Sequence, residues 1–229
     1  MKINTLFIEL NKKYGNLNWW PVDKKYHENN NSDYRFEIII GTILTQNTSW
    51  SNVEKALNNL KAKNIFNINK IESTPVEVIS KLIKPSGYYN QKANSLKIIS
   101  SYFTSEYNSK LDNFFKGELK EIRNKLLDIK GIGPETADSI LLYAGNHPIF
   151  VVDAYTKRLC KRLPIKVKLS YENIQDYFHS ELKTIYKNPE IVRVYNQLHA
   201  LIVIFAKEIC KKKPNCSNCP ISKYCEKLF

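Results

Sequence analysis

The sequence predicts an all-α fold, and three features of it support this prediction. Apolar residues recur at the three- and four-residue spacing of amphipathic helices along almost the whole chain. No segment shows the sustained alternation of apolar and polar residues that is typical of a half-buried strand. Cap-forming residues and prolines stand before several of the apolar stripes. With 229 residues, 43% of them hydrophobic, the chain can form one large domain or two small ones with a substantial core.

Each expected helix has its own apolar stripe. Ser32-Asp33 is a candidate cap for the first of them, and Thr74-Pro75 places a cap before a proline at the first helical position. Asn188-Pro189 opens the last long helix. In chain order, the stripes cover residues 36–44, 53–60, 78–83, 93–103, 119–127, 136–143, 155–163, 174–182 and 194–205.

The charge balance is strongly basic. Lys and Arg number 35 against 22 Asp and Glu, which gives a formal net charge of +13. Such an excess favours a polyanion partner, usually nucleic acid, although a merely soluble basic protein is the alternative. The apolar runs at 6–8 and 201–206 are too short for a secretory signal or a membrane span. We therefore expect a cytoplasmic, nucleoid-associated protein with no membrane partner.

A glycine turn carries the clearest functional signal. Lys130-Gly131-Ile132-Gly133 lies between two expected helices. Such a turn can point backbone N–H groups outward at the start of a helix, which makes a site for one phosphate. Asp153 follows twenty residues after Gly133 as a lone carboxylate. The pattern predicts that one element grips a nucleic-acid backbone while another performs chemistry beside it.

Four cysteines close to the end of the sequence form a second signal. Cys210, Cys216, Cys219 and Cys225 have the spacing C-x5-C-x2-C-x5-C. Four thiolates so close together can wrap one metal centre, either a 4Fe-4S cluster or a structural zinc ion. The spacing does not choose between the two. Cys160 stands apart in an apolar segment and is expected in the core.

Together these segments resemble the helix-hairpin-helix (HhH-GPD) DNA glycosylase superfamily, specifically its endonuclease III branch. The hairpin, with Thr136-Ala137, is similar to the phosphate-binding hairpin of that family. Val152-Asp153 with Arg158-Leu159 is similar to its catalytic aspartate segment, and the cysteines are similar to its iron–sulfur loop. The usual first cysteine spacing is one residue longer. The resemblance favours a 4Fe-4S cluster over zinc.

The resemblance also implies an architecture. A six-helix barrel over residues 28–137 would end in the helix-hairpin-helix. Residues 1–27 and 138–229 would form a second helical domain that carries the metal loop at 210–225. Double-stranded DNA containing a damaged base would lie across the cleft between the two, bound by a monomer.

Three further segments resemble a smaller group within this branch. Trp19-Trp20-Pro21, Leu44–Thr48 and Pro85–Lys92 are similar to the endonuclease III-like 3-methyladenine DNA glycosylases of bacteria, which are monofunctional. Bifunctional endonuclease III enzymes carry a lysine two positions after the second hairpin glycine, and its amine forms a Schiff base with the sugar. This chain has Glu135 there, and a carboxylate cannot form a Schiff base.

Asp153 is the expected catalytic residue. Cleavage of an N-glycosidic bond builds positive charge on the sugar, and a nearby carboxylate can stabilise that charge and orient the attacking water. The same side chain can cap the helix that starts at Ala154. The resemblance gives Gln46 the role of filling the gap that a flipped-out nucleotide leaves. The expected DNA contacts are Gln46, Lys130, Gly131, Ile132 and Gly133.

Aromatic residues near the start of the chain are expected to form the base pocket. Purines alkylated at N3 or N7 carry a positive charge, and aromatic faces attract such a base by about 1–2 kcal/mol in a desolvated site. We expect Trp19, Trp20 and Trp50 to supply these faces, with Pro21 as a further wall. Glu135 in a first helical turn is favoured by the helix dipole. It is placed at the pocket, to order water or a polar group, without a catalytic assignment.

The expected function is removal of alkylated purines from duplex DNA by a monofunctional glycosylase. One alternative is a bifunctional glycosylase/AP lyase on oxidised pyrimidines, in which another amine, such as that of Lys130, acts as nucleophile. The other is a non-catalytic DNA-binding module with a four-cysteine zinc tail.

Overall fold

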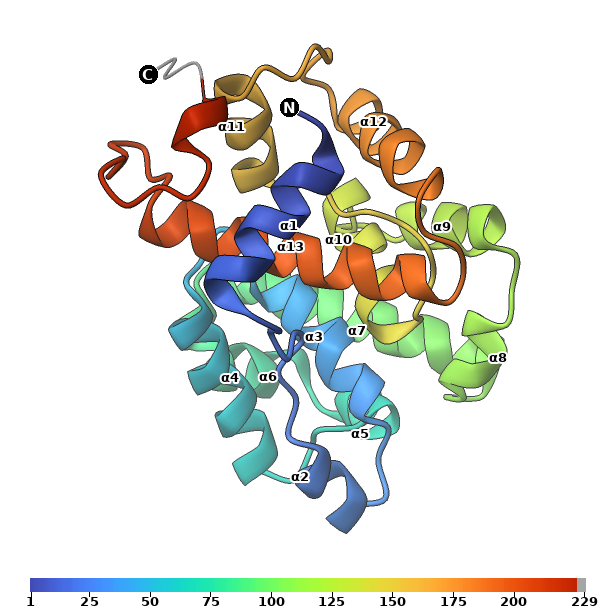
Figure 1. Ribbon diagram of the computed structural model, residues 1–229. Helices are drawn as coiled ribbons and strands as arrows, with labels where there is room; N and C mark the ends of the chain where they lie inside the picture. The colour runs from blue at the N-terminus through green and yellow to red at the C-terminus, as the bar shows by residue number, and fades with distance from the viewer. Residues whose placement is uncertain (226–229) are drawn as a thin grey trace. The chain divides into compact units, whose positions relative to one another are not determined.

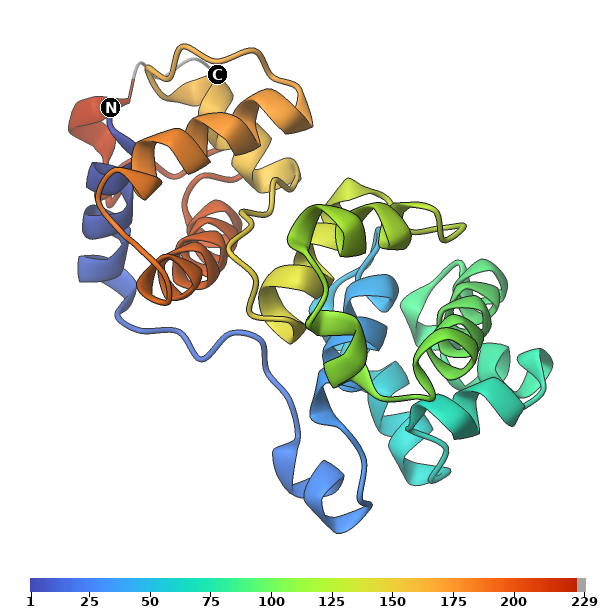
Figure 2. The same cartoon turned by 90° about the vertical axis from the view of Figure 1, so that its right-hand side faces the viewer.

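The computed structural model describes residues 1–225, which are helical and contain no β-strand (Figures 1 and 2). The expected all-α class is therefore confirmed for this part of the chain. The chain divides into two compact units. The central unit is Trp20–Gly145, and the terminal unit combines Met1–Trp19 with the chain from Asn146 onward. The range expected for the barrel, 28–137, lies inside the central unit.

The central unit is organised around one buried helix. All nine residues from Phe36 to Leu44 of α3 are buried. Against α3 pack α4, α7, α10 and the π-helical turn η2, while α5 and α6 pack on α7. In chain order the segments are α2 (Lys24–Asn29), α3 (Tyr34–Leu44), α4 (Trp50–Ala62), α5 (Ile68–Ser73), α6 (Val76–Leu82), η1 (Lys84–Ser86), α7 (Tyr89–Tyr107), α8 (Leu111–Phe115), α9 (Leu119–Leu127), α10 (Pro134–Ser139) and η2 (Ile140–Ala144).

The two caps expected in this unit have different outcomes. Asp33 caps α3 as predicted, since its side chain accepts a hydrogen bond from the Arg35 N–H. The expected cap at Thr74 is wrong by one residue, because α6 has Pro75 in the cap position. The Thr74 hydroxyl instead donates to the Lys70 carbonyl at 2.6 Å. Thr74 thus closes the short helix α5, which the sequence did not reveal.

The terminal unit is built on α13 (Glu190–Glu208), a long helix that is apolar on most sides. It begins directly after Pro189, as expected. Helices α1 (Ile3–Tyr14) and α11 (Ala154–Arg162) pack on it, and α12 (Tyr171–Lys183) packs on α1 (Figure 1). The short turn η3 (Ser222–Tyr224) follows in the cysteine segment. No helix within residues 1–225 combines the length and apolar character needed to cross a bilayer.

A buried lysine joins three segments of the central unit. Lys92 of α7 is 3% exposed. Its ammonium group donates to the carbonyl of Leu44 at 2.9 Å and to the carbonyl of Ser86 at 2.7 Å. These carbonyls end α3 and η1, where the helices themselves offer no donors. Burial lowers the pKa of the Lys92 amine to about 8.

Replacement of Lys92 by methionine tests the importance of this junction. Lys92→Met keeps the apolar stem but leaves two carbonyls without their donor. We expect the free energy of unfolding to fall by about 1–3 kcal/mol, the usual cost of unmet buried polar groups offset by relief of the buried charge. Urea unfolding followed by circular dichroism measures the change.

Lys97→Met on the same helix is the matched control. The Lys97 amine also donates to two backbone carbonyls, those of Glu72 and Thr74, but this side chain is only half-buried. Its loss should be the smaller of the two. Equal losses would contradict a special role for burial at Lys92.

Candidate functional site

The glycine turn adopts a conformation that only glycine accepts readily. It connects α9 to α10, and Gly131 has φ of +93°. A Cβ atom there would lie 2.7 Å from the Ser95 hydroxyl. The Ile132 amide donates to the Ile129 carbonyl at 3.0 Å. Ile132 therefore anchors the turn through its buried side chain, and its N–H group is not available to a phosphate as it stands.

The exposed side of the turn is Gly133 and the start of α10. Gly133 is the cap residue of α10, a Cβ added to it would meet no other atom within 4 Å, and Pro134 occupies the first helical position. Amides in the first turn of a helix have no acceptor within the helix, so this end attracts an anion. Lys130, Gly131 and Gly133 are all exposed. The geometry fits a contact to one phosphate.

Gln46 is held against the turn. It lies between α3 and α4, and its side-chain amide donates to the Gly131 carbonyl at 3.2 Å and to the Thr136 hydroxyl at 3.0 Å. The residue expected to enter the DNA stack thus sits on the hairpin expected to bind the backbone. Insertion into DNA would require these two hydrogen bonds to be exchanged, and that role stays a prediction.

Three of the residues expected at the base pocket are close together. The ring centroids of Trp20 and Trp50 lie 5.3 Å apart in an edge-to-face arrangement. Pro21 and Trp50 line the same pocket. The Trp20 indole approaches α3 so closely that a Cβ at Gly41 would lie 3.1 Å from it. Trp20 also packs at 5.3 Å from the ring of Tyr143, an aromatic neighbour that the sequence did not single out.

The two remaining pocket residues stay predictions. Trp19 is half-buried and belongs to the terminal unit. Glu135 is exposed on the first turn of α10 in the central unit. A carboxylate at this end of a helix is favourable on its own account.

Asp153 caps α11, as expected, and is almost completely buried. It is 7% exposed. Its Oδ1 accepts from the Thr156 N–H at 2.7 Å and from the Thr156 hydroxyl at 2.9 Å. Burial opposes ionisation of this group, but His199 and the Thr156 donors outweigh it, and the pKa of the Asp153 carboxyl lies below its usual range. The structure therefore presents an ionised carboxylate.

His199 is the functional candidate that sequence reasoning missed. Its Nε2 lies 3.7 Å from Asp153 Oδ2, although the two residues are 46 positions apart in the chain. None of the four histidines has a sequence spacing that suggests a site. The only available signal is a polar residue in the apolar stripe of α13, which is also what an ordinary core histidine looks like.

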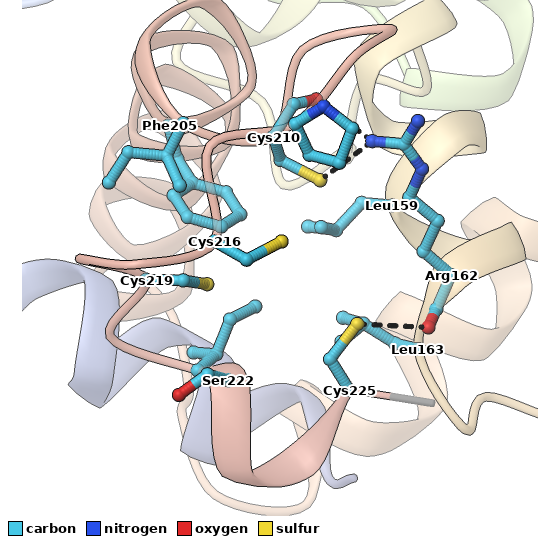
Figure 3. Close-up of a pocket in the computed structure, with 12 residues that line it drawn as sticks. Leu159, Arg162, Leu163, Phe205, Cys210, Cys216, Cys219, Ser222 and Cys225 are labelled. Atoms are coloured by element: carbon cyan, nitrogen blue, oxygen red, sulfur yellow. Dashed lines mark hydrogen bonds between the residues drawn. The ribbon is translucent and has the colours of Figure 1, made fainter. Parts of the chain in front are cut away.

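The four cysteines line one pocket, and their sulfur atoms point into it (Figure 3). Apolar side chains of α11 and α13, among them Leu159 and Phe205, complete the lining. Burial and the neighbouring thiols raise the pKa of Cys219. Within the described residues, no three metal-binding side chains are close enough to hold one ion. The pocket therefore brings together the four cysteines that the sequence predicts as metal ligands.

A buried arginine faces this pocket. Arg162 is 6% exposed, and its guanidinium donates to Cys210 Sγ at 3.2 Å and to the Lys211 carbonyl at 2.7 Å. A buried cation is favourable only beside compensating negative charge or strong acceptors. Thiolates around a metal centre would provide both. Cys160, by contrast, is a core residue as expected, and burial raises its thiol pKa to about 12.

Comparison with known proteins points to DNA repair. A family model, the HhH-GPD superfamily base excision DNA repair protein, matches residues 40–201, well over half of the chain. The chain is 42% identical over 218 residues to "Putative DNA repair glycosylase MJ1434" of Methanocaldococcus jannaschii, which covers 93% of this chain and 90% of that protein. It is 27% identical over 211 residues to endonuclease III of Thermotoga maritima, which covers 90% and 89%.

A solved structure with the same fold is the H. pylori 3-methyladenine DNA glycosylase MagIII bound to 1,N6-ethenoadenine. The TM-score is 0.73 at 28% sequence identity, over 91% of this chain and 98% of that one. The similarity therefore extends over both units rather than the hairpin alone.

A pair of alanine substitutions tests the backbone of the turn. Gly131→Ala meets both a left-handed φ and the Ser95 hydroxyl, so we expect a loss of about 1–2 kcal/mol in the free energy of unfolding. Gly133→Ala has an ordinary φ and open space, and its loss should stay below about 1 kcal/mol. Thermal or urea unfolding compares the two, and a larger loss at Gly133 would contradict the described turn.

Proposed function

The chain belongs to the HhH-GPD superfamily of base excision DNA repair proteins, and from that premise we propose that it is a monofunctional DNA glycosylase for alkylated purines such as 3-methyladenine. The observation that carries the proposal is Asp153, a buried carboxylate kept ionised at the start of α11. Its substrate would be a damaged base in double-stranded DNA, bound by the protein as a monomer.

The proposed chemistry is hydrolysis of the N-glycosidic bond. The C1′–N bond breaks with its electron pair going to the base, and positive charge develops on the sugar. Asp153 stabilises that charge and orients the water that attacks C1′, while the water loses one proton to solvent. Thr156 occupies Oδ1 with two hydrogen bonds, which leaves Oδ2 for these tasks.

Alkylated purines are the proposed substrates for two reasons. A 3- or 7-alkylpurine in DNA already carries a positive charge, so it leaves as a neutral base without a strong general acid. The aromatic cluster of Trp20 and Trp50, with Pro21 beside it, is suited to hold a cationic base. The similarity to MagIII, named as a 3-methyladenine DNA glycosylase, supports the same substrate class.

Glu135 supports the monofunctional assignment. It stands two positions after Gly133, where a lysine amine would be needed to attack the sugar in the bifunctional mechanism. Lys130 is an exposed amine on the same turn. It makes the glycosylase/AP lyase with a lysine nucleophile the alternative to test.

The hairpin is the proposed grip on the DNA backbone. Amides at the start of α10 and the exposed Lys130 would bind one phosphate, a contact that carries no sequence information. Gln46 would leave the hairpin and fill the gap in the stack when the damaged nucleotide rotates out.

We propose that the cysteine pocket holds a 4Fe-4S cluster. Cys210, Cys216, Cys219 and Cys225 would be its ligands, and Arg162 would compensate its negative charge. Such a centre cross-links the loop from 210 to 225, which has little apolar content of its own.

Substitution of Asp153 tests the reaction. We expect Asp153→Asn to reduce single-turnover release of 3-methyladenine or 7-methylguanine from a defined duplex by at least about 100-fold, because a neutral amide cannot stabilise the sugar cation. DNA affinity, measured by fluorescence anisotropy, should change by less than about 3-fold. Free-base release and strand scission are scored separately on a panel that includes oxidised pyrimidines.

Borohydride trapping separates the alternatives on the same panel. The wild-type protein should yield no covalent adduct with any lesion. An adduct that disappears in Lys130→Gln would establish the lyase instead. Tight DNA binding without base release from any lesion would leave only the non-catalytic DNA-binding module.

Metal content tests the cysteine pocket. Purified protein should be brown and contain about four iron atoms and four acid-labile sulfides per chain, and Cys216→Ser should lose most of both. Cys160→Ser is the matched control, because Cys160 lies in the core away from the pocket lining, and it should retain the iron. One zinc ion per chain in place of iron would overturn the assignment.

A further inference from the structure

The two oxygens of Asp153 have different surroundings. Oδ1 accepts two hydrogen bonds from Thr156, at 2.7 and 2.9 Å. Oδ2 faces His199, whose Nε2 lies 3.7 Å away. This contact favours the ionised form of the Asp153 carboxyl group.

We propose that His199 is a positioning residue for Asp153, one that keeps the carboxylate ionised and holds its Oδ2 side in a fixed orientation. The inference rests on the proposed function and names a second residue on which that reaction depends. His199 comes from the middle of α13, is 6% exposed, and packs edge-to-face on Phe150 with centroids 6.3 Å apart. The ring is thus fixed by packing on the same segment that leads to Asp153.

The other polar groups around this pair are directed elsewhere. Arg158 of α11 donates to the carbonyls of Cys210 and Ala206, and the Lys157 amine lies over the ring of Tyr171. The remaining neighbours are polar or apolar groups with other contacts. The Tyr171 hydroxyl accepts a hydrogen bond from the Val152 N–H, and His179 Nε2 accepts one from the Phe150 N–H. Tyr195 is buried, and this burial raises the pKa of its hydroxyl. The last neighbour is the apolar face of α1, which is formed by Ile3, Leu6 and Leu10.

The arrangement has a consequence for the pH dependence of the reaction. Burial favours the protonated carboxyl, whereas His199 and Thr156 favour the ionised one. Removal of His199 leaves burial less opposed, so the pKa of Asp153 rises toward neutral pH. Because the reaction needs the ionised form, a variant without His199 loses more rate at acidic pH than at alkaline pH.

The experiment compares pH–rate profiles of the full-length protein. Single-turnover release of 7-methylguanine from a methylated duplex is measured from pH 5.5 to 8.5, and each variant is compared with wild type at the same pH, so that titration of the base itself cancels. Relative to wild type, His199→Leu should lose about 10-fold more rate at pH 5.5 than at pH 8.5, because the acid limb of its profile moves to higher pH. His199→Gln, which keeps polarity and size but no ionisable ring, should show the same skew and serves if the leucine variant does not fold.

His179→Leu is the matched control. His179 is another histidine of the terminal unit, stacked on Tyr195 and bonded to the Phe150 N–H, so its loss disturbs the same region without touching Asp153. Its rate should fall by a similar factor at every pH. Unfolding temperatures and DNA affinities are measured for all variants.

The outcomes separate the two ideas. If wild-type protein releases no base, the proposed function fails. If wild-type protein is active and the His199 variants have profiles that superimpose on it after scaling, the role of His199 is overturned while the function stands. If His179→Leu showed the same extra loss of rate at acidic pH, the inference would also be overturned, because disturbed packing would then explain the effect.

Discussion

The terminal unit depends on a charge that the fold keeps buried. Asp153 could not remain ionised at 7% exposure unless several groups compensated it. The first turn of α11 supplies the Thr156 N–H and hydroxyl, and α13 supplies His199. The packing of α11 on α13 is therefore both a hydrophobic contact and the condition for an ionised carboxylate. The carboxylate proposed for catalysis is also the cap of α11, so the hydrogen bonds that begin the helix hold the carboxylate in place.

In the central unit, several polar contacts hold the glycine turn and the segment after α3 in place. Gly131 turns the chain with a left-handed φ, and its carbonyl accepts from Gln46. The Gln46 amide also reaches Thr136 on α10, so the segment after α3 is tied to both sides of the hairpin. The Lys92 ammonium bonds the carbonyl that ends α3 a few residues earlier. The hairpin that would touch DNA and the segment after α3 are thus held by polar contacts with α10 and α7.

Local patterns were sufficient for much of this structure, and long-range contacts account for what they missed. The stripe at 119–127 coincides with α9, because a cap, a stripe and a glycine turn all act within a few residues. Short helices such as α5 and α8 have too few apolar repeats to show a period, and both pack on α7. Asp153 could be singled out because its position follows the hairpin. His199 and Tyr143 could not be singled out, because each is relevant only through a contact with a residue distant in sequence. These residues are Asp153 for His199 and Trp20 for Tyr143.

The cysteine loop is joined to Asp153 through one helix. α11 carries Asp153 at its first turn, while Arg158 and Arg162 in its later turns hold the carbonyls and a sulfur at the start of the loop. Arg162 is buried against acceptors that the loop supplies, and a loop closed by a metal centre holds them in place. The proposed metal centre would therefore stabilise, through Arg162, the helix whose first turn carries Asp153.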